Sequence, residues 1–271
     1  MNKKEFVAQN LGNDKIAGRP IRLNQVTLET KAGKDYAEVV LWGDVHYGAR
    51  NCNIEKAKGM LDYCLENNIY LLGMGDLLES ATRYSVGSGV YEQESPQKQI
   101  DDMTAWLEPL AEKGLILGLH TGNHEGRITK ETGIDIMKMI SKSLGVTYLG
   151  SACWNLFKVN KQNYLVYSLH GSSGSRYVYT KLKSLVDISH NFDADLICQG
   201  HINDCADTSM IVQKIDLRSK TVIEHKKFLV LSGHYLKYDN SYAQDKGFPI
   251  GKEGSPKIKF FSEKKDIHIS F

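Results

Sequence analysis

Short apolar runs in this chain repeatedly end in glycine followed by aspartate, asparagine or histidine. Four of them read AEVVLWGD (37–44), IYLLGMGD (69–76), LILGLHTGNHE (115–125) and ADLICQGH (194–201). A continuous run of β-branched and other apolar residues is typical of a buried strand in an α/β sheet. The carboxyl ends of such strands meet at one edge of the sheet, and glycine lets the backbone turn sharply there. The pattern therefore predicts an α/β protein whose polar groups gather at one edge.

The segments between and after these runs complete the fold prediction. Helical patterns cover 54–68, 95–110, 133–145 and 177–192, and the chain after residue 208 is mainly β. Alternating strands and helices followed by clustered strands indicate two mixed sheets flanked by helices, a four-layer α/β/β/α sandwich. No repeat or linker interrupts the pattern. We therefore expect one domain over 1–271, with its motifs in 38–204 and a β-rich C-terminal part over 208–271.

Composition limits the kind of protein this can be. The net charge of +2 gives no general reason to bind nucleic acid, so any basic surface has to be local. The five cysteines are odd in number and form no C-x-x-C pair, which favours reduced thiols in an intracellular protein. The N-terminal stretch has no apolar segment of a signal peptide, and no run approaches the ~20 apolar residues of a membrane helix. We expect a cytoplasmic protein without a membrane partner.

Five polar clusters follow the predicted strands, and their residue types suit metal ions. They are Asp44 with His46, Asp76 with Glu79, the run Asn123, His124, Glu125 and Arg127, then His170, and finally His201 with Asn203 and Asp204. An aspartate can bridge two cations with its two oxygens, and mixed nitrogen and oxygen ligands fit Mn, Fe, Zn or Ni. Two metals about 3.5–4 Å apart can clamp an in-line phosphoryl displacement. The clusters therefore favour a dinuclear centre.

The order D-x-H, G-D-x-x-E, G-N-H-E, H and G-H-x-N closely resembles the calcineurin-like metallophosphoesterase superfamily over about 38–204. The stretches GDLLESATRYSVG and GNHEGRITKETGID look like a phage and bacterial subgroup, which implies a bacterial or phage-infected host cell. The resemblance implies two divalent ions, with Mn²⁺ the first expectation. It assigns the first ion to Asp44, His46 and the bridging Asp76. It assigns the second ion to Asp76, Asn123, His170 and His201.

The resemblance also implies roles beside the metals. His124 would lie next to the scissile phosphate and protonate the leaving oxygen, a contribution of about 10²–10⁴-fold in rate. Glu79, three residues after Asp76, matches the acid that orients this histidine. Arg127 is a candidate phosphate contact, because a guanidinium group matches phosphate oxygens.

One position departs from the superfamily pattern. The final G-H-x-H usually gives a second histidine to the first metal, and this chain has Asn203 there. An asparagine oxygen is a weaker ligand, so we expect the first site to lose its ion more readily than the second. Asp204 is an alternative ligand at this position.

The expected activity is hydrolysis of a phosphate ester, with a phosphodiester, a nucleotide or a nucleic acid (DNA or RNA) favoured as substrate. A phosphomonoesterase or protein phosphatase is the alternative enzyme, although Ser80 stands where the protein-phosphatase signature has arginine. A non-catalytic binding subunit on the same fold is the alternative from another class. The oligomeric state stays open. Weaker candidates for substrate contacts or site roles are Arg83, Tyr84, Arg176, Tyr177 and His234, whereas His120, His190, His225 and His268 are expected to be structural or surface residues.

Overall fold

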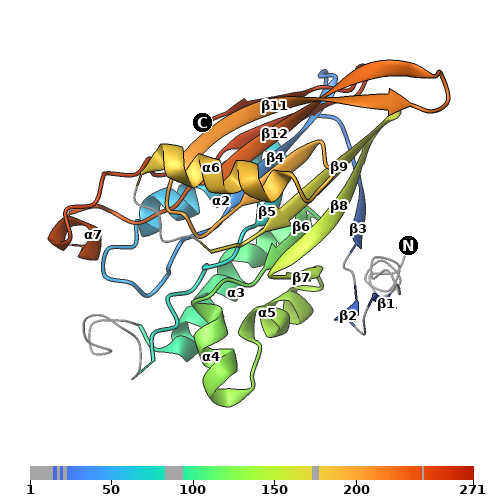
Figure 1. Cartoon of the computed structure of the whole chain (residues 1–271). Helices are drawn as coiled ribbons and strands as arrows, with labels where there is room; N and C mark the ends of the chain where they lie inside the picture. Colours follow the sequence, from blue (N-terminus) through green and yellow to red (C-terminus); the bar gives the residue numbers. More distant parts are fainter. Residues whose placement is uncertain (1–14, 17–18, 21–22, 83–93, 173–176, 240) are drawn as a thin grey trace.

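The computed structural model describes residues 15–16, 19–20, 23–82, 94–172, 177–239 and 241–271. Two six-stranded β-sheets pack face to face, and helices cover the outer face of each sheet (Figure 1). Each sheet contains parallel and antiparallel strand pairs. The prediction of a four-layer α/β/β/α sandwich with two mixed sheets is therefore confirmed.

The first sheet is built from the early part of the chain and its last two strands. In spatial order it contains β14 (Ile267–Ser270), β13 (Lys257–Phe261), β4 (Tyr36–Trp42), β5 (Tyr70–Gly73), β6 (Ile116–His120) and β7 (Tyr148–Gly150). Strands β4 to β7 run parallel, whereas β13 is antiparallel to both neighbours. The connections between the parallel strands contain α2 (Ile54–Asn67), α3 (Pro96–Glu112), α4 (Glu125–Thr132) and α5 (Ile136–Leu144).

The second sheet is built mainly from the later part of the chain. In spatial order it contains β11 (Cys205–Asp216), β12 (Thr221–Ser232), β10 (Leu196–Gln199), β9 (Gln162–Leu169), β8 (Ala152–Val159) and β3 (Leu23–Leu28). Strands β9, β10 and β12 run parallel, and α6 (Val178–Ser189) connects β9 to β10. A separate pair consists of β1 (Lys15–Ile16) and β2 (Arg19–Pro20), and α7 (Tyr242–Asp245) lies between β12 and β13.

Local sequence signals explain several element ends. At the start of α3 the Ser95 side chain accepts from the backbone N–H of Lys98, and Pro96 opens the helix. At the end of α5, Gly145 adopts φ 67°, a left-handed conformation that suits glycine. The sequence pattern did not indicate β3, β7 or α4. Strand β3 is rich in polar residues, β7 has three residues, and α4 buries only Glu125.

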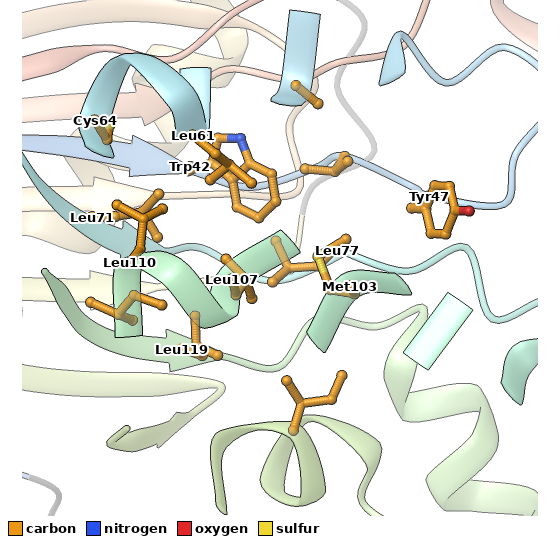
Figure 2. Close-up of a cluster of buried hydrophobic side chains, with 14 of the residues drawn as sticks. Trp42, Tyr47, Leu61, Cys64, Leu71, Leu77, Met103, Leu107, Leu110 and Leu119 are labelled. Atoms are coloured by element: carbon orange, nitrogen blue, oxygen red, sulfur yellow. The ribbon is translucent and has the colours of Figure 1, made fainter. Parts of the chain in front are cut away.

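Three apolar layers hold the sheets and helices together. Along β4, Val40 and Trp42 face α2 and α3, whereas Val39 and Leu41 face the second sheet, as expected for alternating side chains. Figure 2 shows Trp42 in the layer between the first sheet and its helices, beside side chains from those helices. The third layer lies between the second sheet and α6. All five cysteines lie among the described residues, each as a buried free thiol.

This arrangement brings strand ends from both sheets together. The carboxyl ends of β4, β5 and β6 lie in the first sheet, and those of β9 and β10 lie in the second, so the loops after them can meet across the sandwich. The β-rich C-terminal part divides between the sheets, because β11 and β12 extend the second and β13 and β14 extend the first. Among the described helices, none combines the length and apolar character needed to cross a membrane.

Candidate metal centre

The loops after β4, β5, β6, β9 and β10 converge at one edge of the sandwich and carry every ligand expected from the sequence. Five of these residues adopt a left-handed backbone although they are not glycine: Asp44, His46, Asp76, His201 and Asn203, with φ between 49° and 67°. Such a conformation costs on the order of 1–3 kcal/mol per residue and collects at functional sites. The fold therefore holds this edge in a backbone shape that packing alone does not require.

Asp76 belongs to two groups of possible metal ligands. His46, Asp76 and His124 form one group, and Asp76, His170 and His201 form the other. Within each group, one ligand atom per residue lies within 4.8 Å of the others. Because the Asp76 carboxylate is shared, its two oxygens can serve two cations.

The second of these groups also contains Asn123. The Nε2 atom of His170 lies 3.3 Å from Asp76 Oδ2 and 3.1 Å from Asn123 Oδ1. His170 Nδ1 donates to the backbone carbonyl of Met74 at 2.9 Å, which directs Nε2 toward these oxygens. The rings of His170 and His201 have centroids 5.3 Å apart. The structure thus brings together the four residues expected around the second ion.

The residues expected around the first ion are spaced more widely. His46 Nε2 lies 4.0 Å from Asp44 Oδ1 and 3.9 Å from Asp76 Oδ2. The other ring nitrogen of His46 lies 3.1 Å from Glu79 Oε2, which orients the ring. Asp44 Oδ2 accepts from the backbone N–H of His201 at 2.9 Å. The remaining oxygen of Asp44 and Nε2 of His46 are therefore left for another partner.

A further observation shows that the donor set fits cations. Within the described part of the chain, twelve buried side-chain atoms have no hydrogen-bond partner, and four of them belong to the expected ligands: Asp44 Oδ1, His46 Nε2, His201 Nδ1 and Asn203 Oδ1. Buried polar atoms are nearly always satisfied in folded proteins, so each exception needs a reason. All four atoms belong to expected ligands, and their mixture of nitrogen and oxygen suits Mn, Fe, Zn or Ni. Divalent cations at this edge would satisfy them.

The charges of the centre also favour cations. Burial raises the pKa of Asp44 to about 7. Burial also opposes the charged form of Asp76, but the hydrogen bond and charge of His170 hold the pKa of Asp76 well below its usual range. Burial opposes the charged forms of His46 and His170 as well, yet Glu79 and Asp76 raise the pKa of His46 to about 9, and Asp76 raises that of His170 to about 10. The acidic groups thus favour the protonated, positively charged forms of His46 and His170. Metal binding would displace these histidine protons.

Glu79 connects the histidines of the centre. Its Oε2 lies 3.1 Å from Nδ1 of both His46 and His124, and its backbone carbonyl lies 3.0 Å from His124 Nδ1. Burial raises the pKa of Glu79, but the hydrogen bonds to His124 and His46 outweigh burial and hold it well below its usual range. The structure thus places an ionised carboxylate at His124 Nδ1, where the sequence led us to expect it.

Arg127 lies beside Glu79 and His124. Its Nη1 donates to Glu79 Oε1 at 3.2 Å and to the Glu79 carbonyl at 3.1 Å, and its Nη2 lies 2.9 Å from His124 Nε2. Because a guanidinium group only donates, His124 Nε2 accepts in this arrangement, and the ring proton lies on Nδ1 toward Glu79. In this arrangement the guanidinium group is held by Glu79 and His124.

Glu125 has a role that the sequence reasoning did not assign. Its buried carboxylate accepts from the backbone N–H groups of Asp76 (3.1 Å), Leu78 (3.0 Å) and Gly122 (2.8 Å). These bonds tie the loop after β5 to the loop after β6. A Cβ atom on Gly122 would collide with the Asp76 carboxylate, so the two loops approach as closely as glycine permits. The only sequence signal for this role was the glutamate at the end of the G-N-H-E motif.

We expect Glu125→Gln to destabilise the protein by about 1–3 kcal/mol, the cost of leaving a buried donor unsatisfied. The amide nitrogen of glutamine cannot accept, so at least one of the three N–H groups loses its partner. Thermal or urea unfolding measures the change. Glu131→Gln, on an exposed position near the end of the same helix, is the matched control and should unfold like the unaltered protein. Equal stability of both variants would contradict the role assigned to Glu125.

Two neighbouring residues considered from the sequence do not serve as metal ligands in this arrangement. Asp204 Oδ2 lies 3.2 Å from Lys181 Nζ, and Oδ1 accepts from the backbone N–H of Cys205 at 3.0 Å, so both oxygens are engaged. His234 is buried, and its Nδ1 accepts from the backbone N–H of Leu236 at 3.2 Å. The neutral ring then carries its proton on Nε2, which has no hydrogen-bond partner among the described residues.

The remaining candidates lie elsewhere. His190 and His268 are exposed, His225 lies 2.9 Å from Asp195, and His120 is buried between the sheets. Tyr177 is exposed just before α6. Arg83, Tyr84 and Arg176 lie outside the described residues.

Comparisons with known proteins add structural similarity at low identity. No family model matches the chain, and no curated protein matches it. Vacuolar protein sorting 29 from Cryptosporidium parvum is 14% identical, with 88% of this chain and 98% of that chain covered and a TM-score of 0.39. Vps29 from Entamoeba histolytica, complexed with Zn²⁺, is 13% identical, with coverage of 86% and 97% and a TM-score of 0.37. A metallophosphoesterase from Sphaerobacter thermophilus is 12% identical, with coverage of 86% and 87% and a TM-score of 0.41. Similarity at this level does not by itself assign a function.

Proposed function

We propose that this chain is a single-domain, metal-dependent phosphoesterase that hydrolyses a phosphodiester, in a nucleotide, a nucleic acid or a related compound. The order of the motifs supports this proposal, because it resembles that of calcineurin-like metallophosphoesterases. The observation that carries it is the set of four buried, unpartnered ligand atoms around the shared Asp76.

The proposed ligands divide between two divalent cations, with Mn²⁺ as our first choice. Asp44, His46, Asp76 and Asn203 would hold the first cation. Asp76, Asn123, His170 and His201 would hold the second. When bound, two such ions lower the pKa of coordinated water and stabilise the charge on a transferring phosphoryl group.

The residues beside the ligands would position the substrate and move a proton. His124 would protonate the leaving oxygen from Nε2, with Glu79 at Nδ1 to stabilise the charged ring. In the structure Arg127 Nη2 contacts that same Nε2. We therefore propose that a bound phosphate draws the guanidinium group away, because phosphate oxygens are stronger acceptors for it than a neutral imidazole. This shift would free Nε2 to take up a proton from solvent, and the charged ring could then give that proton to the leaving oxygen.

A substrate panel tests the proposal. The protein with saturating Mn²⁺ would be assayed on bis-p-nitrophenyl phosphate, p-nitrophenyl phosphate, cyclic nucleotides, and single- and double-stranded DNA. We expect turnover of diesters above monoesters. Preference for monoesters would favour a phosphatase instead. Absence of turnover on every ester, with metal bound, would favour a binding subunit and contradict the proposal.

The Asn203 position gives a separate expectation for metal affinity. We expect calorimetric titration with Mn²⁺ to show two unequal steps, because Asn203 leaves the first cation with one imidazole ligand whereas the second would have two. Asn203→His should tighten the weaker step by roughly tenfold or more, since even losses outside the ligand set change affinity by about 10–100-fold. Two equally tight sites in the unaltered protein would contradict this expectation.

A further inference from the structure

A chain of hydrogen bonds crosses the layer between the two sheets. Its side chains come from Asn24, Asn155, Ser168 and His120, and each is 0 or 1% exposed. The neighbouring side chains in this layer are apolar. Among the described side-chain atoms of this network, only Asn24 Oδ1 has no partner. Buried polar networks are costly where a member is left unsatisfied, so they make specific demands on the geometry around them.

The hydrogen bonds of the network all run the same way, from the donor Asn24 to the carbonyl oxygen of Gly150 as the last acceptor. Asn24 Nδ2 donates to Asn155 Oδ1 at 3.1 Å, and Asn155 Nδ2 donates to Ser168 Oγ at 2.8 Å. Ser168 Oγ lies 2.7 Å from His120 Nε2, and His120 Nδ1 lies 2.8 Å from the carbonyl oxygen of Gly150. A carbonyl only accepts, so Nδ1 carries the proton, and the neutral ring accepts from the Ser168 hydroxyl at Nε2.

The network crosses between the sheets at two points. Ser168 on β9 of the second sheet reaches His120 on β6 of the first sheet. Asn24 on β3 of the second sheet donates to the carbonyl of Leu117 on β6 at 3.0 Å. Apolar contacts are not directional and resist sliding of two sheets only weakly, whereas hydrogen bonds fix the relative position of their partners.

The Ser168–His120 bond is close in sequence to two proposed metal ligands. His120 ends β6 three residues before Asn123, and Ser168 is two residues before His170. Asn123 and His170 come from different sheets, yet Asn123 Oδ1 and His170 Nε2 lie 3.1 Å apart. The position of one sheet relative to the other therefore decides whether the second site forms.

We propose that Ser168 and His120 are positioning residues that hold the two sheets in the register at which Asn123 and His170 share a cation. This inference rests on the proposed function, because it concerns the second metal site. It predicts that loss of the hydrogen bond weakens one site selectively, whereas a purely structural role would lower stability and leave both metal affinities unchanged.

The test is calorimetric titration of the full, metal-free chain with Mn²⁺. Ser168→Ala removes the hydroxyl and should weaken the tighter binding step by about 10–100-fold, the range for groups that support metal ligands. The weaker step should stay unchanged. Ser168→Thr keeps the hydroxyl and should restore tight binding. Should Ser168→Ala fail to fold by circular dichroism, Ser168→Cys replaces it, because a thiol has similar size and a much weaker hydrogen bond.

Ser141→Ala is the matched control, since Ser141 is equally buried but its hydroxyl has no partner among the described residues. It should bind Mn²⁺ as the unaltered protein does. The inference is overturned if Ser168→Ala binds both ions normally, or if Ser141→Ala weakens the tighter step to the same extent. If the unaltered protein does not bind Mn²⁺, both the proposed function and the inference are overturned. If the unaltered protein binds two ions and Ser168→Ala binds them equally well, only the inference is overturned.

Discussion

Asp76→Asn is expected to lower Mn²⁺-dependent phosphodiesterase activity by about 10³-fold or more. A bound metal contributes several kcal/mol of charge stabilisation to such reactions, and each 1.36 kcal/mol is tenfold in rate. The asparagine side chain has nearly the same size but is neutral and offers one oxygen, whereas the carboxylate that both ligand groups share is charged. Values of kcat/KM on bis-p-nitrophenyl phosphate measure the loss.

The same variant should also bind metal poorly at both sites, because the shared ligand is lost from each. Calorimetric titration with Mn²⁺ checks this directly. Asp62→Asn, at an exposed position of α2, is the matched control and should retain both activity and metal binding. If Asp76→Asn lost only one of two metal-binding steps, the bridging role would be wrong.

His124→Asn is expected to reduce activity by about 10²–10⁴-fold, the usual contribution of a general acid. Metal binding should persist, because His124 is not one of the proposed ligands. The side chain is partly exposed, at 16%, so its replacement should leave the fold intact. Calorimetric titration with Mn²⁺ and a measurement of kcat on the same preparation separate an effect on metal binding from an effect on catalysis.

Leaving groups of different basicity sharpen this test. If His124 donates a proton, the loss should be large for an alkyl leaving group and smaller for p-nitrophenolate, which departs readily without a proton. His190→Asn is the control, since His190 is exposed beyond the end of α6. An equal loss for both leaving groups would indicate that His124 stabilises the phosphate and does not act as an acid.

The sequence was sufficient to predict the layers and the convergence of the expected ligands. Apolar runs such as 37–42 mark buried strands, and a polar residue directly after such a run must lie at the sheet edge. The place of Asp44, Asp76 and Asn123 at the sheet edge follows from this local rule, whereas their assignment to particular ions came from the resemblance to the superfamily. For His170 and His201 the prediction also used the order of motifs, because the relative position of two sheets is not a local property.

Other features depend on contacts between distant residues and could not be predicted. Strand β3 has the polar residue Asn24 at a position that reads as surface, but the structure buries it against the first sheet. The contacts of Arg127 with Glu79 also join α4 to a residue 48 positions earlier in the chain. Two of the three hydrogen bonds of Glu125, those from Asp76 and Leu78, likewise join segments that are far apart along the chain.

Crystals grown with Mn²⁺ and measured at a wavelength that reveals manganese by anomalous scattering would test the central claim most directly. We expect two anomalous peaks about 3.5–4 Å apart, one on each side of the Asp76 carboxylate. The first should lie against Asp44 and His46, and the second against His170 and His201. A map without manganese at Asp76, or with a single ion that does not contact it, would contradict the claim that this carboxylate joins two metals.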